Sequence, residues 1–218
     1  MQRKLTRSVF SRYAVAWLYL VAVCAAEIAY ALLSPSDRVA VLRWASTNIH
    51  NLQHDPVGSL VASAFFAQTY LLAWPALIAL ALFGANHALG NWRTAVTCAA
   101  GHLVGTLVSE VIVAFRVSHG GLPAANRYLV DVGTSYVVMS AIAVALLYGG
   151  WLARTAAALD LLLLIFVGHI FAGLSRLEVS AVGHVTAMLT GAVLGAFLIR
   201  QRRRKARALL DYASASSA

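Results

Sequence analysis

The sequence predicts an all-α, polytopic membrane protein built as a bundle of six transmembrane helices. The first observation is composition: of 218 residues, 61% are apolar and only 11% are charged, whereas a soluble domain is about half apolar and about a quarter charged. The second is that the apolar residues form runs of about 20, the length of a membrane-spanning helix. The third is that basic residues cluster before the first run and after the last.

Six apolar runs cover most of the chain, at residues 14–33, 57–83, 94–115, 132–152, 155–174 and 179–199. In lipid every backbone polar group must be paired within the protein, so these runs are expected to be helices. They are too long for the strands of a membrane barrel. The chain therefore divides into three parts: a basic N-terminus (1–13), one six-helix membrane domain (14–199) and a basic, disordered tail (200–218).

The distribution of positive charge predicts that both termini are cytoplasmic. In this orientation most of the 17 Lys and Arg residues lie on the inner side, and the opposite orientation would reverse the bias. The basic tail then anchors the topology and contacts anionic lipid. We therefore expect a multi-pass protein of the cell membrane, with the lipid bilayer and not nucleic acid as its partner.

Ionisable residues within the apolar runs are costly in a membrane and mark candidate functional sites. They are Glu27, His102, Glu110, Asp160, His169 and His184. At about 1.5 Å per helical residue, Ser135 and His184 lie at a similar depth, roughly 5–8 Å below the outer surface. A serine hydroxyl is a weak nucleophile that needs a neighbouring base, usually histidine. Ser135 and His184 are therefore a candidate catalytic pair.

The residues that follow His184 predict close packing of its helix. Ala187, Gly191 and Gly195 lie on the same helical face as His184. Small residues at this spacing let two helix backbones approach closely. If the neighbour is the helix formed by 132–152, the serine in its first turn comes within reach of the imidazole.

These features resemble the rhomboid family of intramembrane serine proteases. That family has a six-helix core, a Gly-x-Ser nucleophile at the top of the fourth helix, and a histidine followed by packing glycines in the sixth. "GTS" in the fourth run and "GH" in the sixth match this pattern. The resemblance implies that Ser135 is the nucleophile, Gly133 the motif glycine, His184 the base and Gly191 a packing glycine. It also implies transmembrane protein substrates and no cofactor or metal. Within the family, the chain is most similar to the divergent rhomboid-like membrane proteins of actinobacteria.

The chain also departs from the family pattern near these residues. Tyr136 follows the nucleophile where the family has glycine, and Met139 replaces a tyrosine that packs under the histidine. Ala187 replaces the first packing glycine. Asp131, one turn before the nucleophile, is expected to cap the fourth helix and complement its dipole.

The family's His-x-x-x-Asn pair, which stabilises the oxyanion, has no counterpart at the outer end of the second run. His87 and Asn91 have the spacing but are expected in an inner loop, on the opposite side of the membrane. Gln68, Asn51 or His54 could donate instead. Losing one oxyanion donor typically lowers the rate by about 100–1000-fold, so the departure weakens the expectation of activity.

Three functions remain open from the sequence. The first is a serine protease that cleaves transmembrane substrates near the outer leaflet with Ser135 and His184. The second is a catalytically inactive rhomboid-like protein that binds other transmembrane helices, which the missing oxyanion pair favours. The third is a metal-dependent membrane hydrolase with Glu27, Glu110, His169 and His184 as ligands, although no His-Glu-x-x-His spacing supports it.

Overall fold

The computed structural model describes residues 10–67 and 73–215, which form helices joined by turns and no β-strand. The all-α prediction is confirmed. The helix α8 (Thr134–Tyr148) is the centre of the bundle, and all its residues from Tyr136 to Ala145 are buried. It packs against four other helices, α6 (Trp74–Leu89), α7 (Asn91–Ser118), α9 (Trp151–Phe166) and α10 (Val179–Ala215).

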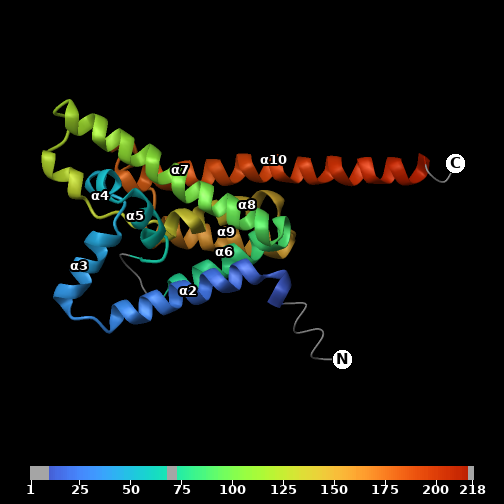
Figure 1. Cartoon of the computed structure of the whole chain (residues 1–218), viewed down its shortest axis with the longest axis horizontal. Coiled ribbons are helices and arrows are strands. Elements are labelled where there is room, and N and C mark those ends of the chain that lie inside the picture. Colours follow the sequence, from blue (N-terminus) through green and yellow to red (C-terminus); the bar gives the residue numbers. More distant parts are fainter. Residues whose placement is uncertain (1–9, 68–72, 216–218) are drawn as a thin grey trace.

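The helix α2 (Ala14–Ala31) packs on α6 and α7 at the side of this bundle. Short helices gather at one end, namely α3 (Pro35–Ala45), α4 (Ile49–His54), α5 (Pro56–Ser63) and the 3₁₀ helix η1 (Ala124–Tyr128). Figure 1 shows that the start of α2 and the end of α10 both lie toward the opposite end.

Three of the described helices are long and apolar enough to cross a membrane by length and composition. They are α2, α7 and α10 over Val179–Tyr212. The helices α6 and α8 are also apolar but shorter. The bundle is thus built from apolar helices of unequal length.

Most of the tail predicted at 200–218 belongs to a long helix. The helix α10 continues without a break to Ala215, and Figure 1 shows it extending well beyond the other helices. Its distal half is rich in Arg, Ala and Leu and lacks Gly and Pro, so its helix propensity is high. The side chains at 200–212 are exposed.

The structure also divides the predicted span at 57–83. The helix α5 ends at Ser63, and α6 begins at Trp74. Residues 64–73 contain no Gly or Pro, which is why the apolar run alone predicts one continuous helix.

Side chains from other helices bond the backbone groups that this interruption frees. The Thr134 hydroxyl donates to the carbonyl oxygen of Phe66 at 2.8 Å, and a Glu27 carboxylate oxygen accepts from the backbone N–H of Ala67 at 2.8 Å. Irregular backbone at membrane depth is tolerated where the protein supplies such partners. The interruption is therefore held against the start of α8 and the side of α2.

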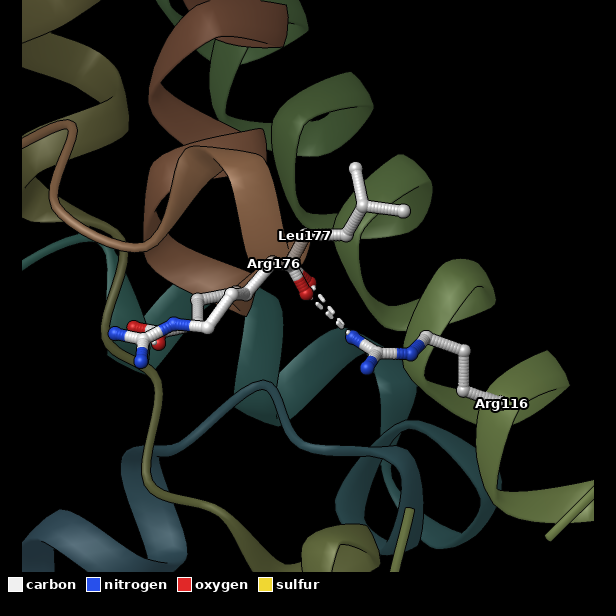
Figure 2. A network of polar contacts seen from close by, with 4 residues as sticks. Arg116, Arg176 and Leu177 are labelled. Atoms are coloured by element: carbon white, nitrogen blue, oxygen red, sulfur yellow. Dashed lines mark hydrogen bonds and ion pairs between the residues drawn. The ribbon is translucent and has the colours of Figure 1, made fainter. Parts of the chain in front are cut away.

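Polar contacts also fix the turn that precedes α10. Arg116, near the end of α7, donates from one guanidinium nitrogen to the carbonyl oxygens of Arg176 at 2.7 Å and Leu177 at 3.4 Å, as Figure 2 shows. Arg176 also forms an exposed ion pair with Glu178 at 3.0 Å. Arg116 thus ties α7 to the start of the helix that carries His184.

Candidate active site

Ser135 and His184 meet where α8 and α10 begin. His184 Nε2 lies 2.8 Å from Ser135 Oγ, and His184 Nδ1 lies 2.8 Å from the carbonyl oxygen of Ile170. A carbonyl can only accept, so Nδ1 carries the ring proton and Nε2 offers its lone pair to the serine hydroxyl. The serine is half-buried and the histidine buried. This donor and acceptor arrangement suits a histidine acting as the base for a serine nucleophile.

The small residues of α10 pack directly on α8. A Cβ added to Gly191 would lie 2.5 Å from the Ser140 carbonyl oxygen, and one added to Gly195 would lie 2.8 Å from the Tyr148 ring. The Ser140 hydroxyl donates to the carbonyl oxygen of Ala187 at 3.1 Å. The stripe of small residues therefore brings the two helices together at their backbones.

Gly133 lets α8 begin against α7. A Cβ at this position would overlap the imidazole ring of His102. That imidazole donates from Nε2 to the Leu60 carbonyl oxygen at 2.9 Å, and the Gly133 N–H donates to the Ser63 carbonyl oxygen at 2.9 Å. The turn that carries the serine is thus held between α5 and α7.

The serine and histidine border a cavity of about 330 Å³. Its lining is mostly apolar, with Trp74 and Leu164 among its residues. It comes from α6, from α9 and the loop that follows it, and from the segments before α6 and α8, the latter with Asp131. His169, which adopts a left-handed backbone conformation with φ of 49°, also lines it. This volume lies within the range of small-ligand sites, about 300–1000 Å³.

Tyr136 and Asp131 lie beside the pair in an arrangement that the sequence does not indicate. The expected capping role of Asp131 is wrong, because α8 has no side-chain cap; instead its Oδ2 accepts from the Tyr136 hydroxyl at 2.9 Å. The Tyr136 ring is fully buried and meets the His184 imidazole edge-on, with ring centroids 5.1 Å apart and an interplanar angle of 71°. Burial raises the pKa of Asp131, which lies outside the helices, to about 7.

The family model for rhomboid-like proteins matches residues 9–205. The chain belongs to the rhomboid-like protein family. The family resemblance is thereby confirmed, and the chain is a membrane protein that lies in a lipid bilayer. No curated protein and no solved structure matches it. The similarity to actinobacterial members stays a prediction.

Two of the expected oxyanion donors of this rhomboid-like protein have other roles. The Asn51 amide nitrogen donates to the Ser46 carbonyl oxygen at 2.8 Å, and His54 Nδ1 donates to the His50 carbonyl oxygen at 2.7 Å. Neither residue lines the cavity, and both hydrogen bonds lie within the loop around α4. Gln68, the third candidate, lies outside the described residues.

His87 and Asn91 contact the start of the chain and do not line the cavity. His87 Nδ1 lies 2.9 Å from the Tyr13 hydroxyl, and the Asn91 side chain donates to the Ser11 carbonyl oxygen at 2.6 Å. These partners adjoin the start of α2, at the end of the rhomboid-like bundle opposite α3 and α4.

The residues proposed as metal ligands do not come together. Across 10–67 and 73–215, no three His, Cys, Asp or Glu side chains form a group that could hold a metal ion. Glu27 bonds the interrupted backbone at Ala67, and both ring nitrogens of His184 are engaged. The metal-hydrolase alternative therefore loses its support.

Proposed function

We propose that this rhomboid-like protein is an intramembrane serine protease with Ser135 as nucleophile and His184 as general base. The observation that carries the proposal is the 2.8 Å contact between Ser135 Oγ and the unprotonated Nε2 of His184, whose Nδ1 donates to Ile170. A serine and a histidine on separate helices need close backbone packing to reach this geometry, and the small residues of α10 supply it.

The reaction follows the usual acyl-enzyme course. Ser135 Oγ attacks the carbonyl carbon of the scissile peptide bond as its proton passes to His184 Nε2. The tetrahedral intermediate collapses, the C–N bond breaks, and His184 gives the proton to the leaving amine. Water then attacks the acyl-enzyme with His184 again as base, which releases the new carboxylate and restores the serine.

The oxyanion would be stabilised by the start of α8. The first backbone N–H groups of a helix have no intrahelical acceptor, and the helix dipole is positive at this end. Ser135 lies in that first turn, so its own N–H is the donor that we assign. One such donor typically accounts for about 100–1000-fold in rate, so a site with fewer side-chain donors is expected to be slow.

We further propose a six-span topology with both termini in the cytoplasm of the cell and the site near the outer face of the cell membrane. The charge bias supports it, as does the placement of the start of α2 and the end of α10 at the end opposite the short helices. The substrates would be transmembrane proteins that unwind near the outer leaflet and place an extended segment in the apolar cavity.

The second candidate is a catalytically inactive protein that binds transmembrane helices. It is favoured by one observation: the only His-x-x-x-Asn spacing in the sequence, His87 and Asn91, bonds to Tyr13 and Ser11 and does not border the cavity. Two of the three side chains expected to replace that pair, Asn51 and His54, do not line the cavity either.

Labelling with a serine-reactive fluorophosphonate separates the two. The protease should label in detergent or lipid, and Ser135→Ala and His184→Ala should each abolish the labelling. A well-folded protein that stays unlabelled in several detergents and lipids would instead support the helix-binding function.

A further inference from the structure

The phenol ring of Tyr136 fills a space that two neighbouring helices leave for it. A Cβ on Gly183 of α10 would overlap the phenol, and one on Gly105 of α7 would lie 3.5 Å from the ring. This space between α7 and α10 lets the Tyr136 ring reach the imidazole of His184 from inside the bundle. Consecutive residues of α8 thus supply the hydroxyl that bonds the imidazole and the ring that packs on it.

Asp131 holds the other end of the phenol. Its Oδ2 accepts from the Tyr136 hydroxyl at 2.9 Å, and only 3% of the residue is exposed. Asp131 is itself fixed through its backbone: its N–H donates to Ser46 Oγ at 2.9 Å, and its carbonyl oxygen accepts from the Thr47 N–H at 2.9 Å. The segment between α3 and α4 therefore fixes the backbone from which the Asp131 carboxylate extends.

The carboxylate and the phenol are hydrogen-bonded to each other, and the Thr47 and Ser109 hydroxyls also lie close to them. A buried polar group without a hydrogen bond is costly, and a hydroxyl that donates to a carboxylate forms one of the stronger bonds in proteins. Glu110 faces Asp131 from α7 as a second acidic group, and the His102 ring lies 6.2 Å from the Tyr136 ring. Tyr136 thus donates a hydrogen bond to this carboxylate from within the bundle.

The imidazole of His184 turns only about the Cα–Cβ and Cβ–Cγ bonds of its own side chain. Ile170 and Ser135 each contact one of its ring nitrogens. The edge-on Tyr136 ring adds a third contact to the imidazole.

We infer that Tyr136 and Asp131 are positioning residues of the site: the Tyr136 ring supports the orientation of the His184 imidazole, and Asp131 holds the Tyr136 hydroxyl. The catalytic meaning of this inference rests on the proposed function. The placement of the imidazole can be measured without it.

The first test measures the rate of fluorophosphonate labelling of the full chain at about pH 8, where the Asp131 carboxyl is mostly ionised. Tyr136→Phe keeps the ring but loses the donor, and we expect about tenfold slower labelling at saturating probe with an unchanged half-saturating concentration. Asp131→Ala should label as slowly as Tyr136→Phe. Asp131→Asn keeps an acceptor oxygen, so it should label at close to the wild-type rate. The double variant Tyr136→Phe/Asp131→Ala should be no slower than either single variant.

The matched control is Tyr148→Phe on the same helix. Tyr148 donates its hydroxyl to the Ala192 carbonyl oxygen of α10 at 2.7 Å, and it does not line the cavity. Loss of the Tyr148 hydroxyl should leave labelling within about twofold of the wild-type rate, because it removes one partly buried phenol hydrogen bond of α8 without touching the imidazole.

The second test observes the ¹⁵N-labelled imidazole of His184 by NMR, with the signals assigned by their loss in His184→Gln. The wild type should show one neutral tautomer protonated at Nδ1, and Tyr136→Phe and Asp131→Ala should shift or broaden these signals while Tyr148→Phe does not. Unchanged His184 signals in both variants would overturn the inference, even if the wild type labels. Signals that respond in a protein that never labels would uphold the inference and reject the protease.

Discussion

Gly191 of α10 lies directly against the backbone of Ser140 of α8, so that an added Cβ would come within 2.9 Å of the Ser140 Cα. A backbone cannot move aside as the end of a flexible side chain can. The distance between the two helices, and with it the approach of His184 to Ser135, therefore depends on the absence of a side chain at this one position.

Gly191→Ala should separate α10 from α8 and slow fluorophosphonate labelling by about 100-fold, since a misplacement of about 1 Å has that effect on a reacting pair. Helix content, measured by circular dichroism, should be retained. Gly150→Ala is the matched control, because a Cβ there meets no atom within 4 Å. Full labelling of Gly191→Ala would show that the contact does not set the geometry.

Gly133→Ala should also reduce labelling, because the new methyl group would overlap the His102 ring. The cause can be tested with a second substitution. In the double variant Gly133→Ala/His102→Ala the space occupied by the ring becomes free, so labelling should recover relative to Gly133→Ala alone. A double variant no better than the single one would point to the backbone of the turn and not to the imidazole.

Glu27 should contribute to stability through the interrupted segment between α5 and α6. Glu27→Gln keeps an oxygen that can accept from the Ala67 N–H, so its melting temperature should stay near that of the wild type. Glu27→Leu leaves this N–H without its partner and should lose about 1–3 kcal/mol of stability. Thermal unfolding in detergent measures the difference, and equal losses for both variants would argue against the hydrogen bond.

Asp131 predicts a pH dependence of stability. Burial raises its pKa to about 7 from an ordinary value of 3.8, with Glu110 facing it as a second acidic group. Its contribution is therefore full below the unfolded-state pKa, declines as the pH rises, and is lost once the pH passes about 7. Between about pH 5 and about pH 8 the wild type should lose more thermal stability than Asp131→Asn, which cannot ionise. Parallel melting curves for the two proteins would rule out this titration.

The proposed topology predicts which residues an impermeant thiol reagent can reach in intact cells. After replacement of the native Cys24 and Cys98 by serine, a cysteine at Ser36, exposed in α3, should react from outside. A cysteine at Ala208, exposed in the distal part of α10, should react only after the cells are permeabilised. The reverse pattern would invert the orientation and place the serine and histidine near the inner face.

The contact between Ser135 and His184 can be predicted from the sequence because it follows from features within each apolar run. Each residue lies near the start of an apolar run at a similar depth, and the small residues that follow the histidine indicate a close neighbour. The all-helical class follows from run length in the same way. The end of α5 before the non-helical residues 64–67 has no such signal, because a residue 40 positions away, Glu27, bonds Ala67.

Tyr136 could not be assigned from its position, because consecutive residues of a helix point about 100° apart. With Ser135 directed at the histidine, the next residue is expected to point elsewhere. The long phenol reaches the imidazole only through the space at Gly183. The Ile170 carbonyl could not be predicted as a partner of His184 either, because every residue has a backbone carbonyl and the type of side chain does not show which one is used.

The unbroken α10 has a practical consequence for any reporter joined to the chain's end. At about 1.5 Å per residue, its 37 residues span about 55 Å, with the imidazole in the second turn and the cationic stretch near the far end. A bulky domain fused rigidly there would act as a lever arm on the histidine, so tagged protein should carry a flexible linker.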